Sequence, residues 1–264
     1  MTTLSRVAGG GIVGAIVTLA GLMTVHAAAA QSLAERIGAV RDGRVRLSYP
    51  TRPGVCGSGH NISMSRSTEH WEPDCEPGPA RVMLTFRRGE LVGVDTYVGG
   101  RWKASGEAIV DLGAVRAPDA ASYLLSLAAS ANAPAGDDVI FPATIADGFT
   151  AWPRLVEIAR NESLRTATRK GAVFWLGQAA GAQVMQDLAD LAQAENMNRD
   201  IQEHAVFALS QLREDEGIPP LLVIARTHRD PHVRKNAMFW LGQSGDDRAI
   251  ALFEEILMGS RSKE

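Results

Sequence analysis

A short apolar motif recurs along the second half of the chain at nearly constant spacing, and this repeat constrains the fold more than any other feature. Successive copies begin 31, 33, 33 and 31 residues apart. The copies are Leu124–Ala128, Leu155–Ala159, Leu188–Ala192, Leu221–Ala225 and, more loosely, Leu252–Ile256. Because one helical unit cannot bury its apolar face alone, such a period predicts a stack of similar units.

A second motif lies between these copies and shares their period. It reads Ala-Val-Phe-Trp-Leu-Gly-Gln in its first copy, and its offsets are 33 and 32 residues. The copies are Ala172–Gln178, Ala205–Gln211 and Ala237–Gln243. Two interleaved helical motifs with one period predict stacked helix pairs, and we call the helices that carry this motif the second helices.

Cap signals support this phasing. Asp230 before Pro231 is typical of a helix start, and Asp200 is expected to cap the middle copy in the same way. Gly217, before two prolines, marks the start of another first helix.

The second helices carry a family resemblance. The unit that starts at Asp230 and closes in Leu241-Gly242 resembles the second helix of a HEAT-like repeat of the phycobilisome-lyase type. The segment 168–177 is similar, whereas the Ile201 copy departs, with Gln202 and Glu203 in place of a basic pair. The resemblance extends roughly over residues 118–258. It implies an α-solenoid of four to five helix pairs.

Solenoids of this type usually bind other macromolecules. Some relatives are enzymes, namely bilin lyases and a di-iron hydroxylase that uses repeated His-Glu pairs. The present chain contains no histidine followed directly by glutamate. The resemblance therefore favours a binding protein over the hydroxylase type.

Residues 1–30 differ from the rest of the chain. They hold one basic residue, Arg6, and no acidic residue, and an apolar stretch over 7–25 is followed by an alanine run. This pattern predicts a secretory signal peptide cleaved near Ala30, and therefore a periplasmic or secreted protein with no membrane span in the mature chain. The alternative is an uncleaved anchor, because 19 uncharged residues are just long enough to span a bilayer.

The mature chain divides near residue 116. Residues 31–116 carry a formal charge of +2, whereas the remainder carries −6. We expect a small α+β domain at 31–116, a helical domain at 117–258 and a tail at 259–264. The small domain matches no family that we can name.

Within 31–116 the local patterns predict one helix and an antiparallel sheet. Ser32 and Glu35 have the spacing of a capping box at a helix start. Alternation over 45–49 predicts a strand, and 81–87 and 91–98 flank a turn in the manner of a hairpin. The segment 51–79, rich in Gly, Pro and Ser, is expected to be an irregular loop.

The only two cysteines, Cys56 and Cys75, fall in that loop. In an exported chain they are expected to form a disulfide. Zinc is the alternative, because His60 and His70 lie between them, although the spacing is not that of a common zinc module.

The second helices also supply the candidate binding residues. At 100° per residue, Ala237 and Leu241 share a buried seam with their equivalents, and the phenylalanine two residues after each alanine lies on the opposite side. Three stripes result: Lys170, Phe174 and Gln178; Glu203, Phe207 and Gln211; and Lys235, Phe239 and Gln243. If the side chains of these stripes are exposed, they form a groove that binds an extended protein segment. The alternative is that they are buried in the core. Trp175 and Trp240 are expected to be core residues.

Other function classes find little support. A net charge of −3 and a pI near 6.1 argue against nucleic-acid binding, and no G-x-S-x-G, H-E-x-x-H or P-loop motif is present. We expect no cofactor. The sequence favours a non-catalytic protein-interaction scaffold whose partner is another protein. The alternative is an enzyme or small-ligand-binding protein with a site between the small domain and the helices, where His60, Glu69 and His70 are the best candidates.

Overall fold

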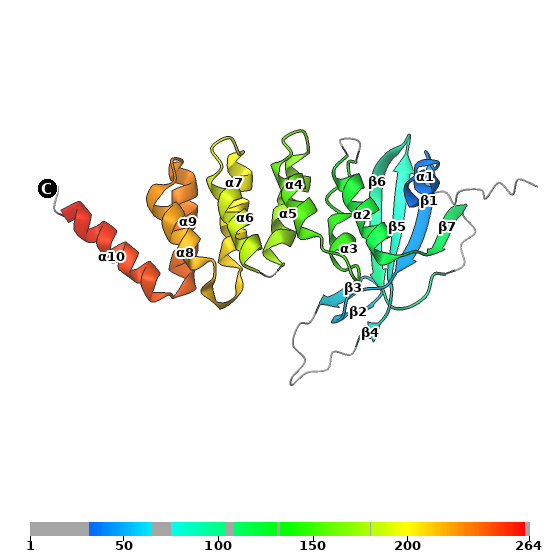
Figure 1. Cartoon of the computed structure of the whole chain (residues 1–264), viewed down its shortest axis with the longest axis horizontal. Helices are drawn as coiled ribbons and strands as arrows, with labels where there is room; N and C mark the ends of the chain where they lie inside the picture. Colours follow the sequence, from blue (N-terminus) through cyan, green and yellow to red (C-terminus); the bar gives the residue numbers. More distant parts are fainter. Residues whose placement is uncertain (1–31, 65–74, 104–107, 131–132, 180, 262–264) are drawn as a thin grey trace, which may run out of the picture. The chain divides into compact units, whose positions relative to one another are not determined.

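The computed structural model describes residues 32–64, 75–103, 108–130, 133–179 and 181–261. The predicted signal peptide lies outside these residues, as do Glu69 and His70. Figure 1 shows a β-rich part followed by a series of helices.

The first element, α1 (Leu33–Gly38), begins with the expected capping box. The backbone N–H of Glu35 donates to Ser32 Oγ at 3.2 Å, and the backbone N–H of Ser32 donates to Glu35 Oε2 at 2.8 Å. Reciprocal bonds of this kind satisfy two amides that a helix start leaves unpaired.

A four-stranded sheet follows, with the strand order β6-β5-β1-β7. Its strands are β1 (Gly43–Tyr49), β5 (Ala80–Arg87), β6 (Glu90–Val98) and β7 (Ile109–Ala114). The β5–β6 hairpin is confirmed, and its two turn residues, Arg88 and Gly89, both have positive φ, as a type I′ turn requires.

The expectation of a purely antiparallel sheet is wrong. β1 pairs antiparallel with β5 but parallel with β7, so the sheet is mixed. The reason is topological: after β6 the chain crosses to the other edge of the sheet and runs alongside β1. A hairpin pattern in the sequence carries no signal for such a crossover.

Part of the segment expected to be an irregular loop forms a second, three-stranded sheet of order β3-β2-β4. Its strands are β2 (Val55–Ser58), β3 (Asn61–Met64) and β4 (Glu76–Pro77). Strands of two to four residues are too short to show an alternating pattern, which is why the sequence did not predict them. Cys56 of β2 and Cys75 form the expected disulfide, with Cα atoms 5.5 Å apart.

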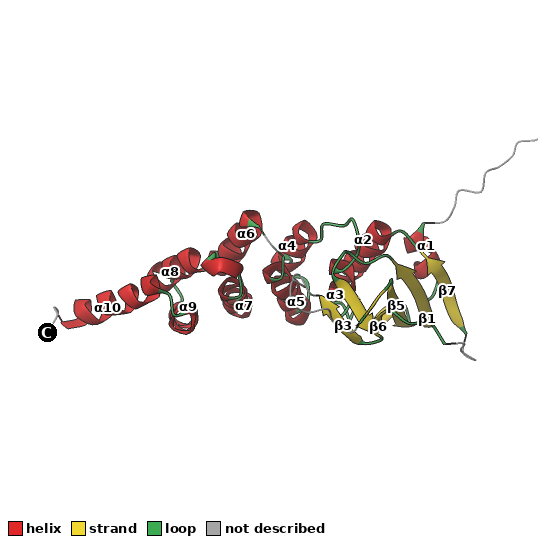
Figure 2. Cartoon of the chain, turned by 90° about the horizontal axis from the view of Figure 1, so that it is seen from below, coloured by secondary structure: helices red, strands yellow, loops and turns green. Residues whose placement is uncertain are grey.

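The helices that follow lie in two layers, which Figure 2 shows edge-on. One layer holds α2 (Ala117–Ala128), α4 (Trp152–Arg160), α6 (Ala182–Gln193) and α8 (Ile218–Thr227). The other holds α3 (Ile140–Thr144), α5 (Thr166–Gly177), α7 (Arg199–Ser210) and α9 (Pro231–Ser244). α10 (Asp247–Arg261) follows and packs on α8 and α9, while η1 (Arg213–Asp215) connects α7 to α8.

The repeat motifs fall on these helices as the sequence predicts. α4 packs on α5, α6 on α7 and α8 on α9, and the second helices α5, α7 and α9 also contact one another in sequence order. The predicted seam is buried: Ala172, Leu176, Ala205, Leu209, Ala237 and Leu241 are at most 1% exposed.

Most helix starts are where the cap signals place them. α9 begins after Asp230, whose carboxylate accepts from the backbone N–H of His232 at 2.8 Å, and α8 begins after Gly217. The expectation for α7 is wrong by two residues, because Asn198 caps it and Asp200 lies in its first turn. Both side chains suit a helix start, so composition alone does not separate them.

One hydrophobic cluster runs through the described residues from Ile37 to Leu252. It joins the sheet to the helices, and Tyr49 lies at this junction. The Tyr49 side chain is fully buried, and its hydroxyl donates to the carbonyl of Pro142 in α3 at 2.7 Å. Burial raises the pKa of the Tyr49 hydroxyl far above its usual range. Among the described residues, none of the helices has the length and apolar character needed to cross a bilayer.

Candidate interaction surface

The aromatic residues of the second helices reach the surface to different extents. Phe174 is 38% exposed and Phe239 is 56% exposed, whereas Phe207 is half-buried. Trp175 and Trp240, which were expected to be core, are also half-buried and pack against the edge of the core. The structure thus leaves two of the three phenylalanines open to a partner.

These rings form two separate clusters. In the first cluster Trp175 stacks on Phe141 of α3, with ring centroids 5.1 Å apart, and meets the edge of Phe174 at the same distance. In the second cluster Trp240 contacts Phe207 of α7 at 5.1 Å and Phe239 at 5.0 Å. Each tryptophan therefore links the phenylalanine of its own helix to a phenylalanine of the preceding helix in the same layer.

A close backbone approach separates the two clusters. The position of the two tryptophans is occupied in α7 by Ala208, and a Cβ built on Gly177 would lie 3.0 Å from the Ala208 Cβ. Among the described side chains no ring contact joins Phe174 to Phe207. The surface is a pair of aromatic clusters rather than a continuous ladder.

The polar members of the stripes have specific neighbours. Lys170 Nζ of α5 lies 3.4 Å from Asp200 Oδ2 of α7, so this lysine pairs with an acid of the next repeat. Gln211 donates to Ser210 Oγ at 3.1 Å, while Lys235 and Gln243 are exposed and Glu203 is half-buried.

Arg169 and Arg234, which precede Lys170 and Lys235 in the sequence, donate to main-chain carbonyls. Arg169 is 4% exposed, and its Nε donates to the carbonyl of Ala159 at the end of α4 at 2.9 Å. Arg234 donates to the carbonyls of His228 and Arg229 after α8. Both side chains satisfy carbonyls at the end of a first helix, where no helical N–H is available.

The middle repeat uses a neutral side chain for the same purpose. Gln202 is 5% exposed, and its Nε2 donates to the carbonyl of Ala194 after α6 at 2.9 Å. Sequence reasoning took Gln202 for a departure from the repeat. Its spacing of 33 residues from Arg169 and 32 from Arg234 is the signal that would have identified the equivalent role.

His204 lies on α7, beside Phe207 of the second cluster. Its ring centroid is 6.0 Å from that of Phe207. Partial burial, and then the positive charge of Lys170, lower the pKa of His204, while Asp200 opposes this shift. The ring is therefore biased toward its neutral form beside the aromatic surface.

Two pockets lie at the C-terminal ends of second helices. One has a volume of about 280 Å³ and is lined by Trp175 and Gln178 of the α5 end. The other has a volume of about 160 Å³ and is lined by Trp240 and Gln243 of the α9 end. The same two residue types, three positions apart, recur at both places.

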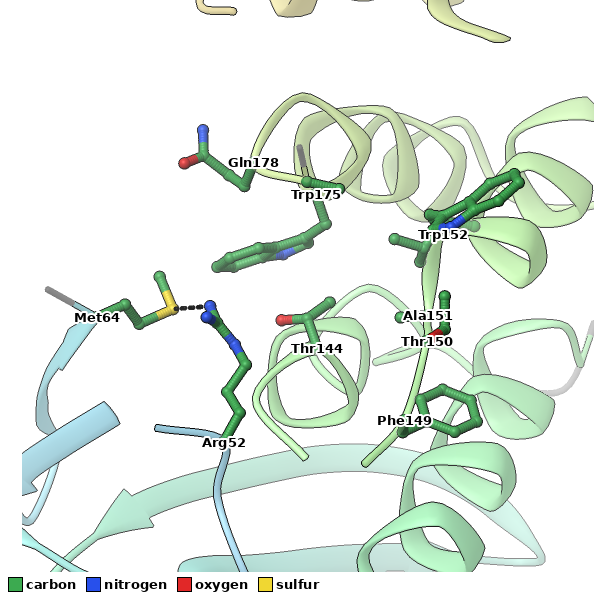
Figure 3. A pocket seen from close by; sticks show the side chains of 11 residues that line it. Arg52, Met64, Thr144, Phe149, Thr150, Ala151, Trp152, Trp175 and Gln178 are labelled. Atoms are coloured by element: carbon green, nitrogen blue, oxygen red, sulfur yellow. Dashed lines mark hydrogen bonds between the residues drawn. The ribbon is translucent and has the colours of Figure 1, made fainter. Parts of the chain in front are cut away.

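The larger pocket lies between the β-rich part and the helices, and Figure 3 shows it from close by. Arg52 and Met64 reach it from the β-rich part, and Phe149 and Trp152 line it from the helical part. Sequence reasoning missed Arg52, because the lining residues are spread from 52 to 179 and no local pattern connects them.

Of the residues proposed for an enzyme at this junction, the one that the structure describes, His60, does not line the pocket. His60 is exposed and packs on Tyr97 of β6, with ring centroids 4.1 Å apart, while Glu69 and His70 lie outside the described residues. The disulfide also removes Cys56 and Cys75 as thiolate ligands for zinc. The residues the structure describes contain no cluster of three side chains able to hold a metal ion.

Comparison with known families gives one match. Residues 189–263, which begin within α6, match the family of HEAT repeats. This confirms the HEAT-like character of that part of the chain. Comparison with curated proteins finds no match.

Proposed function

We propose that the chain is an exported, non-catalytic interaction scaffold: a HEAT-like α-solenoid of four to five helix pairs that binds a protein partner along its second helices. HEAT repeats at residues 189–263 support an interaction role. Pairs α2–α3, α4–α5, α6–α7 and α8–α9 give four units, and α10 begins a further one. The small α+β domain precedes them at residues 31–116.

The observation that carries this proposal is the exposure of Phe174 and Phe239 on equivalent second helices. Exposed apolar patches often mark interaction sites, and two exposed aromatic side chains at equivalent places of two repeats are suited to such a site. Each exposed phenylalanine is held by a half-buried tryptophan, so its ring is positioned before a partner arrives. Such preorganisation reduces the entropy lost on binding.

The polar residues of the stripes suit an extended partner. Glutamine amides at equivalent positions, Gln178, Gln211 and Gln243, offer both a donor and an acceptor to a peptide backbone. Aromatic clusters on either side of Ala208 would then take two apolar side chains of the same segment. In this binding mode backbone bonds supply affinity and the clusters supply specificity.

Export is part of the proposal and has its own test. The composition of residues 1–30 supports a signal peptide cleaved near Ala30. N-terminal sequencing of the protein purified from its native cells should give a chain that starts close to Gln31. A chain that retains residues 1–30 would instead indicate a membrane anchor.

The binding surface is tested with two matched double variants. Phe174→Ala with Phe239→Ala removes the exposed aromatic residues. Val223→Ala with Ile250→Ala removes two apolar residues of similar exposure, 48% and 50%, on α8 and α10. Each protein is first shown to be folded by circular dichroism, and is then used to capture partners from the envelope fraction of the native cells.

The expected result is one specific partner that the wild type and the Val223/Ile250 variant capture equally and the Phe174/Phe239 variant loses. Binding measurements with the purified partner then give the ratio of its affinities for the wild type and for the Phe174/Phe239 variant. Equal capture by both variants would place binding elsewhere. If the Phe174/Phe239 variant unfolds, its side chains are structural and the proposed surface is wrong.

A further inference from the structure

The pocket between the β-rich part and the helices combines apolar walls with a positively charged side chain. Among the residues that the structure describes, eleven line it, and Arg52 is the only charged one of these. Its walls include the side chains of Phe149, Trp152, Trp175 and Met64. A ligand group that complements this pocket has an apolar body and a single negative charge.

The Arg52 guanidinium makes few hydrogen bonds. Its side chain is half-buried, and among the described residues its one hydrogen bond runs from Nη2 to the thioether sulfur of Met64 at 3.8 Å. A guanidinium carries five N–H donors, and a thioether is a weak acceptor. No carboxylate of the described residues lies within ion-pair distance of it, so its capacity for a charged acceptor is largely unused.

The backbone fixes Arg52 in place. Its N–H donates to the carbonyl of Ile145 at 2.9 Å, and Thr51 forms a β-bridge with Ala146. Figure 3 shows the guanidinium between Met64 and Thr144, directed toward the ring of Trp175. The main chain that carries Arg52 is therefore anchored beside the pocket, which its guanidinium enters.

The size and place of the pocket restrict its occupant. A volume of about 280 Å³ is at the lower end of the range for small-molecule sites and suits a single residue better than a large ligand. Trp175, which lines the pocket, also contacts the exposed Phe174 of the proposed binding surface. A peptide lying along the second helices can therefore reach the pocket with one of its ends.

We infer that this pocket receives the C-terminal residue of the bound partner, with its carboxylate on Arg52 and its apolar side chain among the aromatic walls. Arginine forms a two-pronged, charge-assisted pair with carboxylates, which suits a terminal carboxylate. An internal aspartate or glutamate would satisfy the charge but would leave the aromatic walls without an apolar group. The inference rests on the proposed function, since it names the part of the partner that binds at the α5 end.

The test uses N-acetyl-phenylalanine, which carries the carboxylate, the side chain and one peptide bond of a C-terminal residue. Its amide, which lacks the charge, is the matched control ligand. Binding is followed by NMR of ¹⁵N-labelled tryptophan indoles. Trp152 and Trp175 line this pocket, whereas Trp240 lines the smaller pocket of the α9 end, whose described lining residues include no arginine.

N-acetyl-phenylalanine should shift the indole signals of Trp152 and Trp175 and leave that of Trp240 in place. The amide, and the Arg52→Gln protein with either ligand, should bind at least about tenfold more weakly. The Arg52→Lys protein should bind N-acetyl-phenylalanine with intermediate affinity, because lysine keeps the positive charge but cannot form the bidentate pair of a guanidinium. Arg160→Gln, an exposed arginine at the end of α4, is the control and should bind like the wild type.

Equal binding of the acid and the amide, equal binding by Arg52→Gln, or equal shifts at Trp240 would each overturn the inference. Free phenylalanine binding at least about tenfold more tightly than its acetylated form would overturn it as well, and would indicate a site for a free amino acid. None of these results depends on the Phe174/Phe239 experiment. The pocket and the proposed function can therefore fail separately.

Discussion

Tyr49 is the residue at which a side-chain hydrogen bond ties the β-rich part to the helices. Its phenol reaches the carbonyl of Pro142 inside the core. Tyr49→Phe keeps the ring and leaves that carbonyl unpaired, so we expect a loss of about 1–3 kcal/mol in the free energy of unfolding. Urea denaturation followed by circular dichroism measures the loss.

Tyr123 provides the control for this measurement. It is half-buried on α2, and its hydroxyl has no hydrogen bond among the described residues, although burial raises its pKa to about 12. Tyr123→Phe should change stability by less than about 0.5 kcal/mol. Equal effects of the two substitutions would contradict a role for the hydrogen bond.

At the residue scale, the sequence predicts local features but not contacts between residues far apart in the chain. The buried seam and the Asp230 cap could be read from spacing, because both depend on local helical geometry. The contacts of Arg52 and Tyr49 could not, because Ile145 and Pro142 lie about ninety residues away along the chain. Only the tertiary fold brings such pairs together.

At the scale of the helix, the start of α8 depends on a glycine that no other residue can replace. A Cβ built on Gly217 would lie 1.9 Å from the carbonyl oxygen of Leu209 in α7. Gly217→Ala must therefore push α8 away from α7, and we expect a loss of at least about 3 kcal/mol in stability. Chemical denaturation measures it.

Gly38→Ala is the control for Gly217→Ala. Nothing lies within 4 Å of a Cβ at that position, at the end of α1. This variant should stay within about 1 kcal/mol of the wild type or become slightly more stable, because alanine is the better helix former. A Gly217→Ala protein of wild-type stability would show that α7 and α8 can separate freely.

The contact between α5 and α7 should also make stability depend on pH. The pKa of His204 is lower in the folded protein than its usual value of about 6.5, chiefly through burial and then through Lys170. The unfolded chain thus binds the proton more readily, and the folded state loses stability as pH falls through 6.5 toward the lowered value. We expect His204→Gln to lose less stability than the wild type between pH 7.5 and 5.5.

Urea titrations at several pH values test this difference. The window stays above the range in which Asp230 and Asp246, whose pKa values are lowered by hydrogen bonds to backbone and arginine, take up protons. Identical slopes for the variant and the wild type would show that His204 makes no contribution.

Helices and strands differ in how well the sequence predicted them. Every helical repeat motif lies in a helix, because a period near 33 residues and an internal 3.6-residue period reinforce each other. β7 and the three short strands escaped prediction. Their existence depends on partners across the sheets, and a strand of two to six residues carries too little pattern of its own.

At the scale of the whole molecule, the continuous core predicts cooperative unfolding. Since one hydrophobic cluster runs from Ile37 to Leu252, the sheet and the helices should melt together. The Cys56–Cys75 disulfide closes a loop with a sequence separation of 19, which the chain-entropy model values at about 3 kcal/mol. Cys56→Ser with Cys75→Ser should therefore lower the melting temperature of the whole molecule by about 6–12 °C.

Differential scanning calorimetry shows whether the variant unfolds in one transition or in two. A single transition that moves to lower temperature agrees with this expectation. Two separate transitions in the variant would show that residues 31–116 unfold on their own. The boundary near residue 116, which the charge balance predicts, would then also be a boundary of stability.

The meeting of Gly177 and Ala208 has a consequence for how such a surface can change over generations. A Cβ on Gly177 would already lie 3.0 Å from the Ala208 Cβ, so a larger side chain at position 177 would clash with α7. Since no ring contact among the described residues joins the clusters, we expect a substitution in one cluster to leave the packing of the other intact. Under selection, one aromatic cluster can acquire specificity for a new partner while the other cluster still binds the original partner. The specificity of the surface can therefore evolve in two independent steps.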